Sequence, residues 1–128
     1  MNIALLEDNP DIGEFLVIAL EMAGHHAEVY TQGHSLLARL LSEDALAPPL
    51  SYDLLMVDLL LPGGLSGLEV IARIRQVIPP GKLPIIIISG AAASYFAQAH
   101  RDFPDIPIVR KPFEMKTLLR VIEELTRP

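Results

Sequence analysis

The feature that most constrains this chain is a fivefold alternation of short apolar runs with longer, helix-like stretches. We expect strands near residues 2–7, 26–30, 53–58, 83–88 and 106–110. The first, third and fourth runs are apolar almost throughout, as strands covered on both faces of a parallel sheet should be. Alternation of this kind predicts an α/β fold in which helices cover both faces of a parallel sheet.

Two of the expected strands have the character of sheet edges. The run His26-Ala27-Glu28-Val29-Tyr30 is half polar, and the short run near 106–110 carries Pro107, a residue confined mainly to edge strands. With these two outermost, the strand order is 2-1-3-4-5, that of a doubly wound, flavodoxin-like (βα)5 sheet. Ligands of such sheets bind outside the carboxyl ends of the strands, where the strand order reverses.

The expected helices have recognisable ends. Pro10 suits the first turn of a helix and Gly24 its end, while Ser66 and Glu69 have the spacing of a capping box. We expect helices near residues 10–23, 33–43, 66–78, 92–101 and 113–126, and a loop over 45–50. The apolar faces that we expect for the first and third helices comprise Ile12, Phe15, Leu16, Ala19, Ala23, Val70, Ile71, Ile74, Val77 and Ile78.

The length and charge of the chain limit its function. Its 128 residues suit a single domain, and we expect residues 1–128 to form one. A net charge of −6 argues against direct binding to DNA or RNA, whose phosphates attract basic surfaces. The chain has no cysteine, no apolar run of membrane-spanning length and no signal peptide pattern, so we expect no membrane association and a cytoplasmic location.

Polar side chains follow four of the apolar runs. They are Glu7 with Asp8, then Asp58, Ser89 and Lys111. Because the carboxyl ends of parallel strands meet at one edge of a sheet, we expect these groups to converge there. An aspartate such as Asp58 can accept a phosphoryl group as an acyl phosphate. Lys111 would offset the negative charge of the carboxylate and the phosphoryl group, and Ser89 would donate to a phosphoryl oxygen.

The clustered acids also predict a metal. Mg²⁺ binds through one or two carboxylates together with phosphate oxygens and water. Asp8, Asp58 and the backbone carbonyl of Leu60 are the expected ligands, with Glu7 binding directly or through a water molecule. Three acids placed so close together should raise the pKa of at least one, so the metal affinity should fall at low pH.

Four motifs together resemble the receiver domain of the two-component response regulator family. They are Leu6-Glu7-Asp8-Asn9, Asp58-Leu59-Leu60-Leu61-Pro62, Ser89-Gly90 and Lys111-Pro112-Phe113. The resemblance implies that Asp58 is the phosphoacceptor, that Glu7 and Asp8 bind Mg²⁺, and that Ser89 and Lys111 complete the site. It also implies a cis peptide bond between Lys111 and Pro112. Any one of these motifs alone is a weak signal, whereas the combination is specific.

The resemblance further implies a regulatory domain rather than an enzyme with a free substrate. Its phosphoryl donor would be a phosphohistidine of a sensor histidine kinase or a histidine phosphotransfer protein. Its output would be a contact with a protein effector, through the surface formed by residues near 92–101, 106–110 and 113–126. A homodimer through this surface is left open.

Two features depart from the family pattern: Ile108, and the loop over residues 62–67, which is one residue longer than its commonest form. Ile108 stands three residues before the lysine, where the family usually has Tyr or Phe, so the usual aromatic partner of the switch hydroxyl is missing. Leu60 and Ala91 flank the site without a polar group that could orient an attacking water, which predicts slow self-dephosphorylation.

Three other functions compete with this interpretation. The first is a phosphorylation-independent interaction module of the same fold, and the absence of the usual aromatic residue at Ile108 is compatible with it. A haloacid-dehalogenase-type phosphatase would need an acid two residues after its nucleophile, where this chain has Leu60. A flavodoxin-like cofactor binder is disfavoured because Glu7 and Asp8 would repel a phosphate after the first strand.

Overall fold

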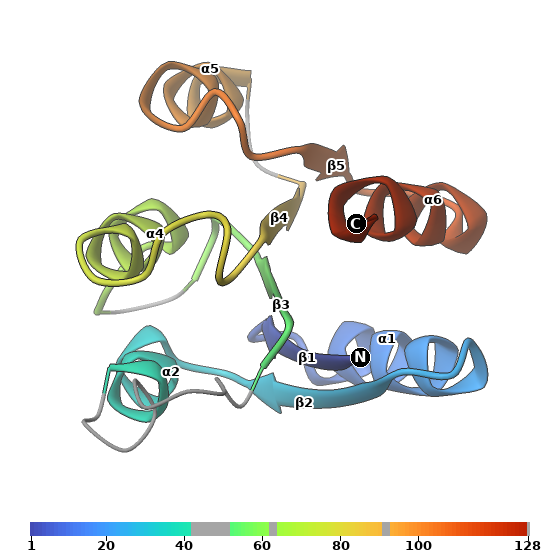
Figure 1. Cartoon of the computed structure of the whole chain (residues 1–128). Coiled ribbons are helices and arrows are strands. Elements are labelled where there is room, and N and C mark those ends of the chain that lie inside the picture. The colour runs from blue at the N-terminus through green and yellow to red at the C-terminus, as the bar shows by residue number, and fades with distance from the viewer. Residues whose placement is uncertain (42–51, 62–63, 91–92, 128) are drawn as a thin grey trace.

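The computed structural model describes residues 1–41, 52–61, 64–90 and 93–127. Within them the strands form one parallel sheet in the order β2-β1-β3-β4-β5 (Figure 1). The strands are β1 (Asn2–Leu6), β2 (His26–Tyr30), β3 (Leu54–Val57), β4 (Ile85–Ser89) and β5 (Ile108–Arg110). The predicted fold class and strand order are therefore confirmed, with the half-polar strand at one edge and, at the other, a short strand that begins directly after Pro107.

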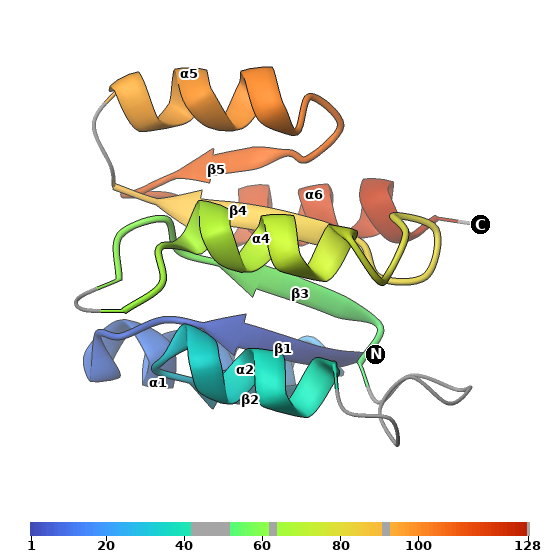
Figure 2. The same cartoon turned by 90° about the vertical axis from the view of Figure 1, so that its left-hand side faces the viewer.

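Helices cover both faces of the sheet. The helices are α1 (Pro10–Met22), α2 (Gly33–Leu40), α4 (Gly67–Arg75), α5 (Ala93–Asp102) and α6 (Met115–Thr126). Helices α1 and α6 lie on one face, and α2, α4 and α5 lie on the other (Figures 1 and 2). No helix in the described part of the chain is both long and apolar enough to cross a membrane. The loop predicted over 45–50 lies outside the described residues.

The three central strands explain the continuous apolar runs. Successive side chains of a strand point to opposite faces, so a strand between two helical layers buries every position. In β1, Ile3 and Leu5 enter the core beneath α1 and α6, whereas Ala4 and Leu6 enter the core beneath α2, α4 and α5. All four side chains are fully buried. The sheet is thus held rigidly from both sides, which fixes the positions of its strand ends.

The helix ends form as the sequence predicts. Pro10 stands in the first turn of α1, and the Asn9 side chain accepts from the amides of Asp11 and Ile12 at 2.9 and 3.2 Å. Gly24 follows α1 with a positive φ of 92°, a conformation that favours glycine. Ser66 and Glu69 form the reciprocal capping box at the start of α4.

The prediction of the buried apolar faces is wrong for three residues, which are exposed. Phe15 is 53% exposed, Val77 is 50% exposed and Ala23 is also exposed. In α1 the buried line runs through Gly13, Leu16 and Leu20, and Phe15 lies about 100° around the helix from Leu16. Val77 lies beyond the end of α4 at Arg75, so the helical period no longer sets its direction.

Helix α4 begins in tight contact with the end of β3. The Gly67 amide donates to the Leu59 carbonyl at 3.3 Å. A Cβ atom on Gly67 would overlap the Asp58 carbonyl oxygen and would lie 2.8 Å from the Leu59 Cα. Only glycine allows the helix to approach so closely, because both of these neighbours are backbone atoms.

We predict that Gly67→Ala lowers the free energy of unfolding by about 1–3 kcal/mol, the usual cost of forcing an extra group into a packed site. The matched control is Gly81→Ala, because a Cβ at Gly81 meets nothing within 4 Å. The control should change stability by less than about 0.5 kcal/mol. Urea unfolding of the two variants measures the difference, and equal stabilities would contradict the close contact.

Candidate functional site

Three carboxylates meet at the carboxyl edge of the sheet. Glu7 and Asp8 directly follow β1, and Asp58 directly follows β3. The strand pairing continues into these residues, because the Glu7 amide donates to the Tyr30 carbonyl at 2.9 Å and the Asp58 amide donates to the Leu6 carbonyl at 3.0 Å. One carboxylate oxygen from each acid lies within 4.8 Å of the other two. We call Glu7, Asp8 and Asp58 the acidic site.

Lys111 connects two of these acids. Its Nζ lies 2.8 Å from Glu7 Oε2 and 3.0 Å from Asp58 Oδ2. The lysine follows β5, and its amide donates to the Ser89 carbonyl at 3.0 Å, so its side chain reaches across the end of β4. The peptide bond between Lys111 and Pro112 is cis, as the resemblance predicts.

Asp58 is held by three donors. Its Oδ1 accepts from the Ser89 hydroxyl at 2.7 Å and from the Leu60 amide at 3.1 Å, while its Oδ2 accepts from Lys111. Asp58 is 5% exposed and Ser89 is fully buried, so the carboxylate has little freedom to turn. Leu60 contributes its amide to this arrangement, and its side chain is 45% exposed.

The burial of the site shifts two pKa values. Burial raises the pKa of the Glu7 carboxyl, and hydrogen bonds from Lys111 and the Asn9 amide offset only part of this effect. The sequence predicts a raised pKa from repulsion between acids. The rise is confirmed for Glu7, but burial is its largest cause and the charge of Asp58 a smaller one. Burial alone would lower the pKa of Lys111, yet its hydrogen bonds to Glu7 and Asp58 outweigh burial and raise it.

The acidic site has the chemistry of a site for a hard divalent cation. All three side chains offer carboxylate oxygens, the donors that Mg²⁺ prefers. Glu7 and Asp58 are buried, whereas Asp8 is partly exposed at the mouth of the site. A cation that keeps several water molecules could therefore bind from the solvent side, as Mg²⁺ characteristically does. The donor set thus fits the metal that the sequence predicts.

Sequence reasoning missed three features around the site. They are the hydrogen bond from the Asn9 amide to Glu7 Oε1, the close approach of Gly67, and a cation–π contact in which the Arg110 guanidinium lies 4.5 Å from the centre of the Phe96 ring. The first follows from a tight turn after β1, and the other two arise only when α4 and α5 pack on the sheet. Pro62 of the second motif and Ala91 lie outside the described residues.

Related sequences match this chain over almost its whole length. Residues 3–123 match the response regulator receiver domain family. The chain is 34% identical over 124 residues to the response regulator receiver protein CpdR of Brucella abortus, and the match covers 96% of this chain and 94% of CpdR. It is 30% identical over 126 residues to the response regulator ArlR of Staphylococcus haemolyticus, over 98% of this chain and 52% of ArlR. The chain thus spans about half the length of ArlR.

Solved structures share the fold. The chemotaxis protein CheY4 of Vibrio cholerae superposes with a TM-score of 0.79 at 19% identity, with 97% of both chains covered. The response regulator TrrA of Thermotoga maritima, solved in complex with Mg(2+)-BeF, gives a TM-score of 0.79 at 26% identity, again with 97% of both chains covered. With the match over residues 3–123, these likenesses show that the chain belongs to the response regulator receiver domain family, a family of regulatory domains.

Proposed function

We propose that this chain is a single receiver domain that accepts a phosphoryl group on Asp58 and signals to a protein partner by a change of conformation. The donor is a phosphohistidine of a sensor histidine kinase or a histidine phosphotransfer protein. The observation that carries the proposal is the arrangement around Asp58, whose carboxylate is bound by Ser89 and Lys111 and lies against Glu7 and Asp8.

In the transfer step, a carboxylate oxygen of Asp58 attacks the phosphorus of the donor. A bond forms between this oxygen and phosphorus, the bond between phosphorus and the imidazole nitrogen breaks, and its electron pair stays on that nitrogen. Lys111 already binds Asp58 Oδ2 and stands ready to offset the charge of the incoming phosphoryl oxygens. The chain thereby assists its own phosphorylation rather than turning over a free substrate.

Glu7, Asp8, Asp58 and the Leu60 carbonyl are the residues that would hold Mg²⁺. When bound, the metal supplies positive charge that reduces repulsion between the carboxylates and the phosphoryl group. Glu7 also fixes the ammonium of Lys111 at 2.8 Å, so it orients the lysine toward Asp58 as well as contributing to the metal site.

Phosphorylation would replace the charge of the Asp58 carboxylate with the larger negative charge of the phosphoryl oxygens. It should also transfer the Ser89 hydrogen bond from Oδ1 to a phosphoryl oxygen. Ser89 ends β4 and its carbonyl accepts from Lys111, so its movement acts on the start of α5 and the end of β5. Arg110 and Phe96 join these two elements. We propose that this contact, rather than an aromatic residue at position 108, changes the effector surface of α5, β5 and α6.

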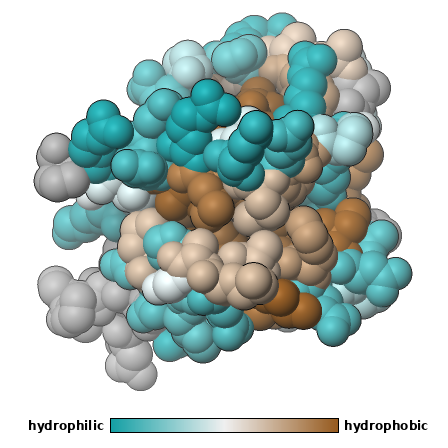
Figure 3. Space-filling model, turned by 90° about the vertical axis from the view of Figure 1, so that its right-hand side faces the viewer, coloured by the Kyte–Doolittle hydropathy of each residue, from teal (hydrophilic) through white to brown (hydrophobic). Residues whose placement is uncertain are grey.

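The surface beside the acidic site suits a protein donor. Phe15, Ile18 and Met22 are exposed on α1, by 53%, 53% and 84%, at helical spacing. Figure 3 shows apolar residues gathered on the side of the molecule where α1 and α6 lie. Because α1 begins two residues after Asp8, a partner helix seated there would present its histidine close to Asp58.

We predict that Asp58→Asn abolishes phosphoryl uptake from acetyl phosphate in the presence of Mg²⁺, because an amide cannot form the acyl phosphate. The matched control is Asp53→Asn. Asp53 is exposed at the opposite end of β3 and binds the Asn2 amide at 2.8 Å, so uptake should be unchanged. Intact-mass spectrometry measures both. Uptake that survives in Asp58→Asn, or no uptake by the unaltered protein, would favour the phosphorylation-independent interaction module.

We predict that Mg²⁺ affinity falls as the pH decreases from neutrality. The raised pKa of Glu7 means that its proton is retained to a higher pH than on an ordinary glutamate, and this proton opposes metal binding. The decline should approach about tenfold for each pH unit below the Glu7 pKa. In Glu7→Gln the affinity should be lower at neutral pH but should change less with pH. Calorimetric titrations of both proteins test this, and parallel pH curves would exclude Glu7 as the titrating group.

We predict slow hydrolysis of the acyl phosphate because the leucine at position 60 offers no group to orient water. Leu60→Asn should shorten the lifetime of the acyl phosphate about tenfold. This is a small part of the roughly 10²- to 10⁴-fold rate enhancement that general acid–base catalysis can contribute. Leu60→Met, which stays apolar, should leave the lifetime unchanged. The decay is followed after removal of acetyl phosphate. A lifetime of only seconds in the unaltered protein would count against this prediction.

A further inference from the structure

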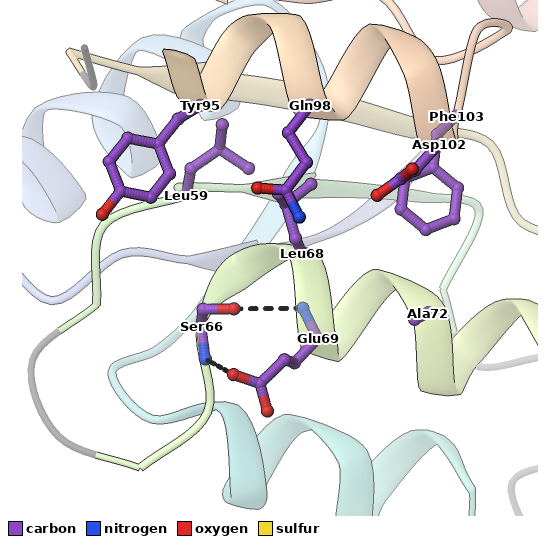
Figure 4. A pocket seen from close by; sticks show the side chains of 9 residues that line it. All are labelled: Leu59, Ser66, Leu68, Glu69, Ala72, Tyr95, Gln98, Asp102 and Phe103. Carbon is purple, nitrogen blue, oxygen red and sulfur yellow. Dashed lines mark hydrogen bonds between the residues drawn. The ribbon is translucent and has the colours of Figure 1, made fainter.

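A groove between α4 and α5 lies outside the acidic site. It has a volume of about 310 Å³ and is closed at its base by Leu59, Leu68 and Phe103. Figure 4 shows α4 and α5 as its two walls, with the capping box of Ser66 and Glu69 at one end. This volume is at the lower limit for pockets that enclose a small molecule, so the groove suits one or two side chains of a larger partner.

The two walls differ in chemistry. On α5, Tyr95, Gln98 and Asp102 follow one another at helical spacing and line the groove. Gln98 reaches from α5 toward Leu68 on α4, and Ala72 adds only a small side chain further along the facing wall (Figure 4). In the part of the chain that the structure describes, none of these three α5 side chains makes a hydrogen bond or ion pair. The groove thus has an apolar base and a row of polar groups along one wall.

The charge of the groove is negative. Glu69 and Asp102 line its two walls, and no Lys, Arg or His is among its lining residues. The Glu69 carboxylate accepts from the Ser66 amide, which leaves Asp102 as the carboxylate without a protein donor among the described residues. A long basic side chain can lay its methylene groups on the apolar base and extend its charged end to such a carboxylate.

From this combination we propose that the α4–α5 groove binds a segment of a partner protein that carries an arginine next to an apolar residue. The arginine stem packs on Leu68 and Phe103, and its guanidinium meets Asp102 and the Gln98 carbonyl oxygen. The neighbouring apolar side chain covers the end of the groove at Leu59. Charge complementarity favours a basic segment over an acidic one, consistent with the net charge of −6.

The groove is also connected to the acidic site. Leu59 follows Asp58 directly, and Gly67 at the start of α4 lies in close contact with the backbone of both residues. A change at Asp58 therefore moves one end of the groove. This coupling, unlike binding itself, rests on the proposed phosphorylation of Asp58.

The probe is the dipeptide acetyl-Leu-Arg-amide, titrated into ¹⁵N-labelled protein in excess Mg²⁺ so that the acidic site does not attract it. Acetyl-Leu-Gln-amide is the uncharged control peptide. We expect saturable amide shifts around Leu59, Ala72 and Gln98 with the arginine peptide and much weaker shifts with the glutamine peptide. Equal shifts with both peptides, or shifts spread over the acidic surface, would overturn the proposal.

Three variants locate the binding. Ala72→Leu fills the groove from the exposed face of α4 and should abolish the shifts. Asp102→Asn should weaken binding about two- to fivefold, as expected for an exposed ion pair. Glu124→Gln removes an exposed acid on α6, on the other face of the sheet, and should have no effect. Undiminished binding in Ala72→Leu would exclude the groove.

The coupling is tested by repeating the titration with beryllofluoride, a mimic of the phosphoryl group. A several-fold change in affinity supports it. If beryllofluoride shifts the Asp58 amide but leaves peptide affinity unchanged, the coupling is wrong while the groove remains a binding site. If beryllofluoride does not act on Asp58 at all, the proposed function fails instead.

Discussion

The ion pairs of Lys111 with Glu7 and Asp58 are the interactions on which the functional edge of this molecule depends. Both carboxylates are almost completely buried, and an uncompensated charge at such a position is costly. Removing one partner of a buried ion pair typically destabilises a protein by about 3–5 kcal/mol. The fold meets this requirement by ending β1, β3 and β5 at the same edge, so that a side chain as long as lysine can reach both acids across β4.

The same ion pairs make the site sensitive to a change of charge. Lys111 and a bound divalent cation would share Glu7 and Asp58 as partners, so each would affect how strongly the other is held. The raised pKa of Lys111 keeps its charge permanent, whereas the raised pKa of Glu7 makes that carboxylate the more easily protonated partner. Conversion of Asp58 to an acyl phosphate would add negative charge beside these groups and upset an arrangement with few ways to relax, and the buried Ser89 hydroxyl is the group in direct contact that could respond.

The parts of this structure that the sequence predicts are those set by local patterns. Continuous apolar runs identify the central strands, and the polar residues that follow them identify the functional edge before any contact is known. The errors occur where tertiary packing decides. Phe15 and Val77 are apolar residues near a helical period, but the rotation of α1 and the early end of α4 leave them exposed. The Arg110–Phe96 contact could not be predicted either, because it joins two elements whose separation only packing sets.

The short segment Asp58-Leu59 faces two environments at once, and this would allow the proposed chemistry at one edge of the sheet to affect a second surface. The Asp58 carboxylate is buried among Ser89, Lys111 and the acids, whereas the Leu59 side chain is buried at the base of the α4–α5 groove. Gly67 removes the side chain that would otherwise separate α4 from this segment, so helix and strand end are in backbone contact. Because packed interiors deform little, a displacement of Asp58 would be transmitted to α4 rather than absorbed between them. A larger residue at position 67 would open a gap here, so the glycine serves both the packing of α4 and its coupling to the acidic site.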